Sequence, residues 1–419
     1  MNGTRRMLLK AAALVPLMSA QRAVWGQSQE VVWWTPNWGQ ARAEELARRF
    51  QAANPDVRVK IEITVADGLQ NRVLTALRSG TPPDLIDINS GWTIPYGLTG
   101  DLLVIDDIVQ QQKIDLTDFL PAPMATARVN GKLMGLPYRI EGHGFIYNRG
   151  AYREAGLDPD KPPKTWDELI EYSKRLTRRT SDGKQQYGLG VCGGGEVGNV
   201  IFRAMPQIWM NGGAVISDDL KRAVVNEPAA VQAVDFYTSP FTKHGIAPPS
   251  TLQNDGLAIR RLFIAGAVAQ YQSGQFDIAP IRKENPALEI GVAKLPTPKG
   301  KDPAVVLGGW SFIIPRAAKN VSGAARLMGF LAQPDNMGYY TDTFPARKSA
   351  MTMPRFQDPI LQAFREMLPY ARPVPPIRDW LQMVQIFFDQ TQRILLKEAS
   401  AQDAMNEAAK AMQRLLDRA

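Results

Sequence analysis

Residues 31–88 switch repeatedly between the hydrophobic period of a strand and that of a helix, and few folds accommodate this alternation. A β-rich run at 31–35 precedes a helical stripe of Ala43, Leu46, Ala47 and Phe50. Residues 57–64 then alternate apolar and polar side chains, as a strand with one wet face does. A second stripe at 69, 73 and 77 ends at Ser79-Gly80, before the apolar run 85–88. This order predicts an α/β protein whose parallel sheet is covered by helices.

Helical and strand patterns also alternate in the rest of the chain. Thr165 and Glu168 form a capping-box pattern that predicts a helix over 166–178, and 401–416 carry an apolar stripe typical of a packing helix. We find no repeat, no low-complexity block and no flexible linker. About 390 residues beyond the first 26 predict two or more cores. The absence of a linker indicates that two lobes share several chain crossings.

The first 26 residues have the pattern of a targeting peptide. Arg5, Arg6 and Lys10 precede an apolar run at 11–18, and the spacing of the arginine pair fits the twin-arginine export pattern. Arg22 lies just before the expected cleavage site, which leaves Gln27 as the mature start. The apolar run is too brief to span a bilayer. We therefore expect a free periplasmic protein.

Charge and composition exclude several classes of function. Removing residues 1–26 takes away four basic residues and no acid, which leaves a basic excess of only four and no run of like charges. Nucleic acid is therefore not an expected partner. The single Cys192 excludes an internal disulfide, and the two distant histidines, His143 and His244, give no zinc pattern. We expect no metal and no cofactor.

Several segments, taken in order, carry a family resemblance. They are FQAANP at 50–55, SGTPPD at 79–84, GKLMGLP at 131–137, FIYNR at 145–149, AGLD at 155–158, KTWDEL at 164–169, GGW at 308–310, AARLMGFL at 324–331 and PAR at 345–347. Each is weak alone, but the ordered set resembles the extracellular solute-binding proteins of ABC importers. The resembling branch is the carbohydrate-uptake one, family 1, which includes maltose-binding-like and glycerol-phosphate-binding-like proteins.

The resemblance implies a two-lobed periplasmic-binding-protein fold, in which hinge strands join two mainly parallel sheets flanked by helices. Its expected boundaries are 27–137 plus 278–314 for the N-terminal lobe and 138–277 plus 315–419 for the C-terminal lobe. It also implies a monomer that captures a sugar in the cleft between the lobes. Closure of the lobes around this ligand then presents it to permease subunits in the inner membrane. No reaction is expected.

A sugar site needs carboxylates, amides and arginines around aromatic plates. Asn37, Trp38, Asn89, Ser90 and Trp92 follow predicted strands at the edge where a parallel sheet opens its crevice. In the resembling maltose-type proteins, a glutamate placed like Glu141 contacts the ligand. The full set of candidates is Asn37, Trp38, Asp87, Asn89, Ser90, Trp92, Arg139, Glu141, Glu196, Trp209, Tyr271, Gln275, Phe276, Gly309, Trp310 and Arg372. Each of four candidates also has a structural alternative. Trp38 fills a core, Trp310 is buried at a lobe interface, Asp87 is structural, and Glu141 forms a surface ion pair with Arg139.

Three other functions stay open at this point. Arg139 or Arg372 suits an anionic sugar derivative or a glycerophosphodiester. A secreted glycosidase would use a carboxylate pair such as Asp87 and Glu141. The GGGEVG run at 193–198 formally matches a dinucleotide fingerprint, but it falls in mid-chain without a clear second strand.

Overall fold

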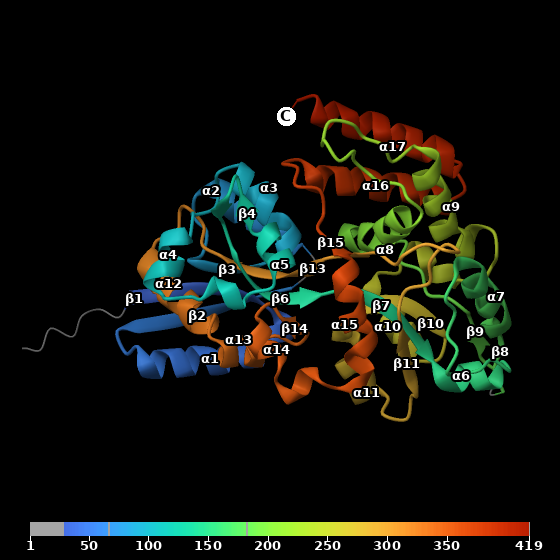
Figure 1. Ribbon diagram of the computed structural model, residues 1–419, viewed down its shortest axis with the longest axis horizontal. Helices are drawn as coiled ribbons and strands as arrows, with labels where there is room; N and C mark the ends of the chain where they lie inside the picture. Colours follow the sequence, from blue (N-terminus) through green and yellow to red (C-terminus); the bar gives the residue numbers. More distant parts are fainter. Residues whose placement is uncertain (1–28, 66–67, 182, 419) are drawn as a thin grey trace, which may run out of the picture.

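Two sheets flanked by helices lie side by side in the computed structural model, which describes residues 29–65, 68–181 and 183–418 (Figure 1). The expected targeting peptide at 1–26 lies outside the described residues. Within the described ranges, no helix combines the length and the apolar character that crossing a membrane requires. The predicted two-lobed α/β fold is confirmed.

The first sheet has the strand order β14-β6-β13-β3-β1-β2. Its strands are β1 (Gln29–Pro36), β2 (Val57–Thr64), β3 (Leu85–Asn89), β6 (Leu136–Glu141), β13 (Gly308–Ile313) and β14 (Phe344–Pro345). β1 pairs in parallel with β2 and β3, whereas β13 runs antiparallel to both β3 and β6. The predicted strand–helix alternation is therefore correct, and the sheet continues through β13 to β6 and β14 with antiparallel pairing.

Helices α1 (Gln40–Ala53) and α2 (Leu69–Ser79) connect the first three strands. α1 buries the four apolar side chains at helical spacing, Ala43, Leu46, Ala47 and Phe50. α2 ends at Gly80, whose positive φ of 70° closes the helix at little steric cost. Sequence periodicity thus fixes both which face of each helix is buried and where α2 stops.

The second sheet has the strand order β10-β7-β11, formed by β7 (His143–Asn148), β10 (Gln270–Gly274) and β11 (Ile290–Ala293). Residues 187–190 extend it through parallel bridges beside β10. Phe145 and Tyr147 face one core, with α7 (Trp166–Leu176), α8 (Val197–Met210), α9 (Pro228–Thr242), α16 (Trp380–Leu395) and α17 (Ala401–Leu416). Ile146 faces the other side, with α10 (Gly256–Ile264), α11 (Ile278–Glu284) and α15 (Gln362–Met367).

Short elements complete both lobes. The first lobe contains α3 (Thr93–Leu98), α4 (Asp106–Gln111), α5 (Pro121–Thr126), β4 (Arg128–Val129), β5 (Lys132–Leu133), α12 (Val321–Leu331), α13 (Pro334–Tyr340) and α14 (Lys348–Met351). The second contains α6 (Arg149–Glu154), β8 (Arg178–Arg179), β9 (Gln185–Gln186), β12 (Val305–Val306) and β15 (Ala371–Arg372). The capping box of Thr165 and Glu168 is present at the start of α7, as predicted.

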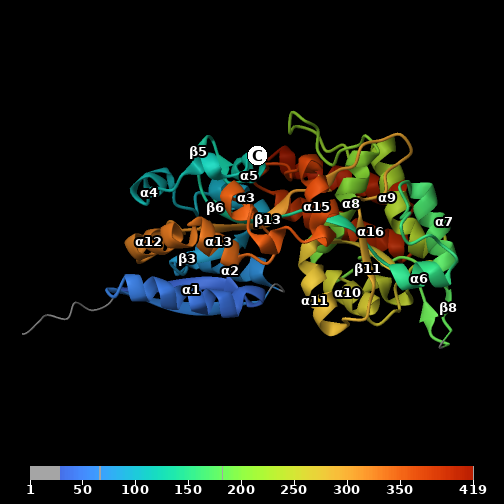
Figure 2. The ribbon, with the colours of Figure 1, turned by 60° about the horizontal axis from the view of Figure 1, so that its bottom comes forward.

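The chain crosses between the lobes at Gly142, at Leu307 and again before α15. The expected lobe boundaries differ from this packing in two segments. α11 and β11, expected in the first lobe, belong to the second, where β11 pairs with β7. Residues 315–356, expected in the second lobe, pack on the first: α12 and α13 cover its sheet (Figure 2), and β14 pairs with β6. Pairing between strands that are far apart in sequence determines the lobe to which each of these two segments belongs. Local sequence patterns do not encode such pairing.

Candidate functional site

The ends of four strands meet at one edge of the first sheet. Because β13 is antiparallel to its neighbours, its start lies beside the carboxyl ends of β3 and β6, where Trp310 is opposite both Asn89 and Arg139. The carboxyl end of β1 leads at the same edge into Asn37 and Trp38. The sequence therefore predicted correctly that the loops after β1 and β3 open at one edge.

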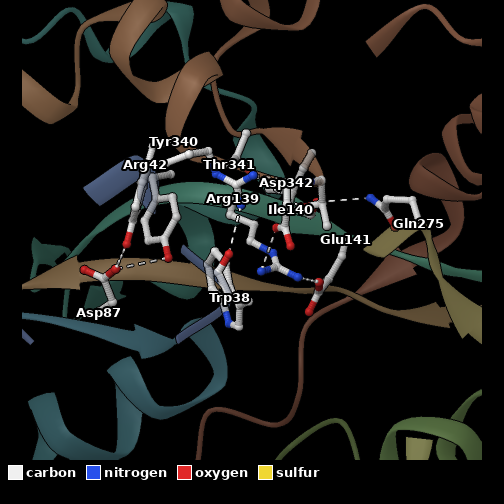
Figure 3. Close-up of polar contacts among 12 residues, drawn as sticks. Trp38, Arg42, Asp87, Arg139, Ile140, Glu141, Gln275, Tyr340, Thr341 and Asp342 are labelled. Carbon is white, nitrogen blue, oxygen red and sulfur yellow. Dashed lines mark hydrogen bonds and ion pairs between the residues drawn. The ribbon is translucent and has the colours of Figure 1, made fainter. Parts of the chain in front are cut away.

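Arg139 is the centre of this edge. Its guanidinium is 4% exposed and forms ion pairs of 2.8 Å with Glu141 Oε2 and with Asp342 Oδ1. It also lies 4.2 Å from the ring centre of Trp38. Burial by itself lowers the pKa of Arg139, but the charges of Asp342 and Glu141 outweigh it and raise that pKa. Figure 3 shows the two carboxylates pointing at the guanidinium, with Trp38 beside it.

Aromatic rings surround the Arg139–Glu141–Asp342 group. The rings of Trp38 and Trp310 meet edge to face, with centroids 5.4 Å apart, and Tyr340 lies 6.3 Å from Trp38. Phe276 approaches from the second lobe, with its centroid 5.9 Å from the Arg139 guanidinium carbon. The Gln275 side chain donates to the Ile140 carbonyl at 3.3 Å, so both lobes contribute to this region.

Several buried polar atoms of this group have no hydrogen-bond partner among the described residues. They are Arg139 Nε and Nη1, Asp342 Oδ1, Gln275 Oε1 and Arg42 Nε. The Arg139 Nη1–Asp342 contact is an ion pair without hydrogen-bond alignment. Since buried polar groups are normally satisfied, donors and acceptors concentrated in this way indicate a place where hydroxyl groups bind.

Two glycines bring the strands of this site close together. Gly309 has φ of +149°, and a Cβ there would lie 2.2 Å from the Arg139 carbonyl oxygen. A Cβ on Gly308 would lie 2.7 Å from Glu141 Cγ. The Gly-Gly pair is therefore required by the close approach of β13 to β6, and it positions Trp310 next to Arg139.

Asp87 does not belong to this group. Its side chain is 1% exposed inside the first lobe, where it accepts hydrogen bonds from Trp33 Nε1 at 2.8 Å and from the hydroxyls of Tyr340 and Tyr138. Burial raises the pKa of Asp87 to about 7, and the Tyr340 and Trp33 hydrogen bonds oppose this shift. The candidate Asp87 is a core residue, which is the structural alternative that the sequence left open.

The remaining first-lobe candidates mostly shape the loops. The Asn89 side chain accepts from the Gly91 amide, and the Ser90 hydroxyl lies 2.9 Å from that of Ser311. Trp92 packs with its ring centroid 6.4 Å from that of Tyr96. Asn37 is exposed beside Trp38.

The second-lobe candidates fall into three places. Gln275 and Phe276 lie at the hinge beside Arg139, whereas Tyr271 is fully buried and its hydroxyl donates to Asp277. Gln275 and Phe276 lie in the turn after β10, whereas Tyr271 lies within β10 and points to its α10 face, where its ring meets Phe263. The other face carries Gln272, which the sequence analysis did not select.

Glu196, Trp209 and Arg372 do not contact the Arg139 group. Glu196 is exposed at the start of α8 and accepts from the Asn199 side chain. Arg372, exposed on β15, lies 5.8 Å from the ring centre of Trp209. β15 pairs with β12, so this second group is next to the crossing that leads into β13.

Tyr340, the last residue of α13, and Asp342, between α13 and β14, were missed because they lie in a segment expected in the other lobe. No local signal shows that residue 342 reaches Arg139; only the pairing of β14 with β6 brings it there. The glycine run at 193–198 is explained by packing, since a Cβ on Gly194 would lie 2.2 Å from the Leu252 carbonyl oxygen. The space that a pyrophosphate needs at Gly194 is filled by the protein's own chain. No cluster of His, Cys, Asp and Glu among residues 29–65, 68–181 and 183–418 is suited to a metal ion.

Comparison with known proteins gives a consistent result. The family model for bacterial extracellular solute-binding proteins matches residues 35–338. A Brucella abortus protein named as a binding protein is 26% identical over 375 residues, 87% of each chain. The sn-glycerol-3-phosphate-binding periplasmic protein UgpB of Escherichia coli is 25% identical over 335 residues, 75% of this chain and 73% of that protein.

Two solved structures share the whole fold. An ABC transporter solute-binding protein from Thermotoga lettingae, bound with α-D-tagatose, has a TM-score of 0.85 at 25% identity and covers 93% of this chain and 100% of that one. UgpB from Mycobacterium tuberculosis, in complex with glycerophosphocholine, has a TM-score of 0.82 at 26% identity and covers 93% and 99%. The family and these neighbours are binding proteins, so the predicted ABC-importer solute-binding protein is confirmed. The chain belongs to the bacterial extracellular solute-binding proteins.

Proposed function

We propose that the protein captures a neutral sugar or polyol at the Arg139–Glu141–Asp342 group and delivers it unchanged to the permease subunits of an ABC importer. The observation that supports this choice is the ion pairing of Arg139. One buried cation faces two carboxylates, so the charge of Arg139 is already balanced within the protein.

This charge balance favours hydroxyl groups over anions. At 4 Å and an effective dielectric constant near 20, two like charges repel by about 4 kcal/mol. A phosphate placed beside Glu141 or Asp342 therefore gains little from Arg139, which is already neutralised. The carboxylate oxygens instead accept from ligand hydroxyls, and charge-assisted hydrogen bonds of this kind are among the stronger ones.

The aromatic rings suit the flat CH faces of a sugar ring. Trp38, Trp310 and Phe276 come from both lobes around the polar group. A ligand that touches Phe276 and Trp310 together does so only when the lobes are close. Its binding energy thereby selects the closed form, which the permease recognises.

An anionic ligand is the second candidate, and Arg372 favours it. This exposed guanidinium lies against Trp209 and has no carboxylate within ion-pair distance among the described residues. UgpB of Mycobacterium tuberculosis holds glycerophosphocholine on a similar fold. If this candidate is correct, Arg372→Gln weakens binding and high salt does so as well.

Hydrolysis of the ligand is not part of this proposal. The carboxylate pair considered for a glycosidase requires Asp87 to face the scissile bond, but its oxygens accept from Trp33, Tyr138 and Tyr340 inside the lobe core. The carboxylate that does lie near Glu141 is Asp342, and both are ion-paired with Arg139.

The location in the periplasm is a proposal that rests on residues 1–26. The twin-arginine pattern implies that the protein folds before export, which agrees with its lone Cys192. Replacing Arg5 and Arg6 together by lysine is expected to retain the protein in the cytoplasm; unchanged export would contradict a twin-arginine route. We propose that the mature protein is a monomer, and size-exclusion chromatography with light scattering checks this.

Screening by thermal shift, followed by mass spectrometry, tests the proposed function. Sugars, polyols, sugar acids and glycerophosphodiesters are added at a concentration of about 100 times a working Kd, where a specific ligand stabilises by about 2.7 kcal/mol. A stabilising neutral sugar or polyol that is recovered unchanged supports the proposal. Stabilisation by anionic compounds alone, or recovery of a cleaved ligand, contradicts it.

A further inference from the structure

The second lobe contains a cavity away from the Arg139 group. It has a volume of about 50 Å³ and lies between the sheet face at Phe145 and helices α7, α8 and α9. Its walls are mainly apolar, with Leu169, Leu189 and Phe236 among them. Arg203, Gln207 and Gln272 also line it, as does Tyr237, whose hydroxyl donates to the Cys192 carbonyl. A mainly apolar cavity with a few convergent polar groups is the usual form of a small-molecule site.

Arg203 is a buried cation without a counter-ion. Its side chain, 5% exposed, donates through Nε to the Gln272 carbonyl at 3.2 Å and through Nη1 to the carbonyl and side-chain oxygens of Asn199 at 3.0 Å. No carboxylate lies within ion-pair distance of it in the part of the chain that the structure describes. The hydrogen bonds to Gln272 and Asn199 use Nε and Nη1, and Nη2 takes no part in them.

Neighbouring acids do not form an ion pair with Arg203 among the described residues. Asp277 is held by Arg260 at 3.0 Å and by the hydroxyls of Tyr271 and Ser273. Burial raises the pKa of Cys192 to about 11, so this thiol is neutral at physiological pH. Burial disfavours the charged form of Arg203 and the charge of Asp277 favours it from a distance, so an anion in the cavity would supply the direct counter-ion that Arg203 lacks.

The amides beside Arg203 are fixed in orientation. Trp166 Nε1 donates to Gln207 Oε1 at 3.0 Å, and Gln207 Nε2 donates to Gln272 Oε1 at 3.3 Å. Gln272 Nε2 in turn lies 3.4 Å from His143 Nδ1. This chain of side chains leaves Arg203 as the only charged group on the cavity wall.

The volume and charge together define the occupant. One water needs about 10–15 Å³ on this measure, so 50 Å³ accommodates about four non-hydrogen atoms. A single guanidinium balances one negative charge, and the Nη2 group of Arg203 is the part of it that donates to neither Gln272 nor Asn199. Apolar walls suit a short alkyl group. We propose that the cavity at Arg203 binds a small monocarboxylate such as acetate, at a site separate from the sugar cleft.

Acetate and acetamide form a matched pair that tests the charge requirement on the unmodified protein. Titration of [1-¹³C]acetate, followed by NMR, is expected to show saturable binding that acetamide at equal concentration does not displace. Arg203→Gln is expected to weaken acetate binding at least about tenfold, since hydrogen bonds to charged groups are worth more than neutral ones. Arg282→Gln, which removes the same charge from an exposed ion pair with Asp358, is the control and leaves binding unchanged.

Leu169→Phe provides a second variant in case Arg203→Gln does not fold. It fills the cavity from α7 and keeps every charge, so acetate binding is lost while the sugar cleft still binds its ligand. Trp310→Ala is expected to leave acetate binding unchanged. Absence of saturable acetate binding to the wild-type protein overturns the proposal. So does binding that acetamide displaces, or that persists in both Arg203→Gln and Leu169→Phe.

Discussion

Protonation of the buried Asp87 carboxyl gives a quantitative prediction about stability. Burial raises the pKa of Asp87 from 3.8 to about 7 in the folded protein. The folded state therefore binds a proton more readily than the unfolded state between these values. The resulting stabilisation is complete below pH 3.8, falls as the pH rises, and is lost above about pH 7.

The size of this effect follows from the two pKa values. At 1.36 kcal/mol for each tenfold change, the difference between 3.8 and about 7 corresponds to about 4 kcal/mol. Asp87→Asn removes the titration and keeps the shape of the side chain. Its amide oxygen still accepts from Trp33, and the hydroxyls of Tyr138 and Tyr340 rotate to accommodate the amide nitrogen.

Urea unfolding of wild-type and Asp87→Asn protein, at pH values from about 4 to about 8, measures this contribution. We expect the free energy of unfolding of the wild type to fall relative to the variant by up to about 4 kcal/mol as the pH rises over that range. The difference between the two proteins cancels the titration of all other groups. A difference that stays constant with pH would refute the reasoning, because Asp87 would then be ionised throughout.

Three further predictions concern the site and the fold. Gly309→Ala is expected to lower the free energy of unfolding by more than about 2 kcal/mol, because the new Cβ would lie 2.2 Å from a carbonyl oxygen. Gly212→Ala, with φ of +85° and open space around it, is the control for backbone strain alone. Equal losses in the two variants would contradict the clash. Thr165→Ala removes the capping box of α7 and is expected to lower the free energy of unfolding by about 1 kcal/mol in urea titrations, whereas no change would show that the cap is not formed. Trp310→Ala is expected to weaken ligand binding at least about tenfold in calorimetry while Trp310→Phe retains most of it, and equal affinities would remove Trp310 from the site.

Local patterns sufficed to predict the first five elements of the first lobe, from β1 to β3. The stripes at 43, 46, 47 and 50 and at 69, 73 and 77 identify α1 and α2, and the runs at 57–64 and 85–88 identify β2 and β3. In each case the period of apolar side chains is a property of one segment. The pattern can therefore be recognised without knowing which other segment the element packs against.

Side-chain direction and long-range pairing were not predictable in the same way. Tyr271 and Gln272 are neighbours on β10, yet only Gln272 faces the Arg203 cavity, because a strand alternates its faces. Asp87 carries the same charge as Glu141 but points into the core, where three donors surround it. Asp342 reaches Arg139 only because β14 pairs with β6.

The central claim is that the ligand binds at a group whose arginine is already neutralised by two carboxylates. Calorimetric titration of the best ligand from the thermal-shift screen, at about 20 mM and about 500 mM NaCl, tests it most directly. We predict a Kd that changes less than about twofold between the two conditions. A Kd that rises about tenfold or more with salt would show that an anion is bound and would contradict the claim.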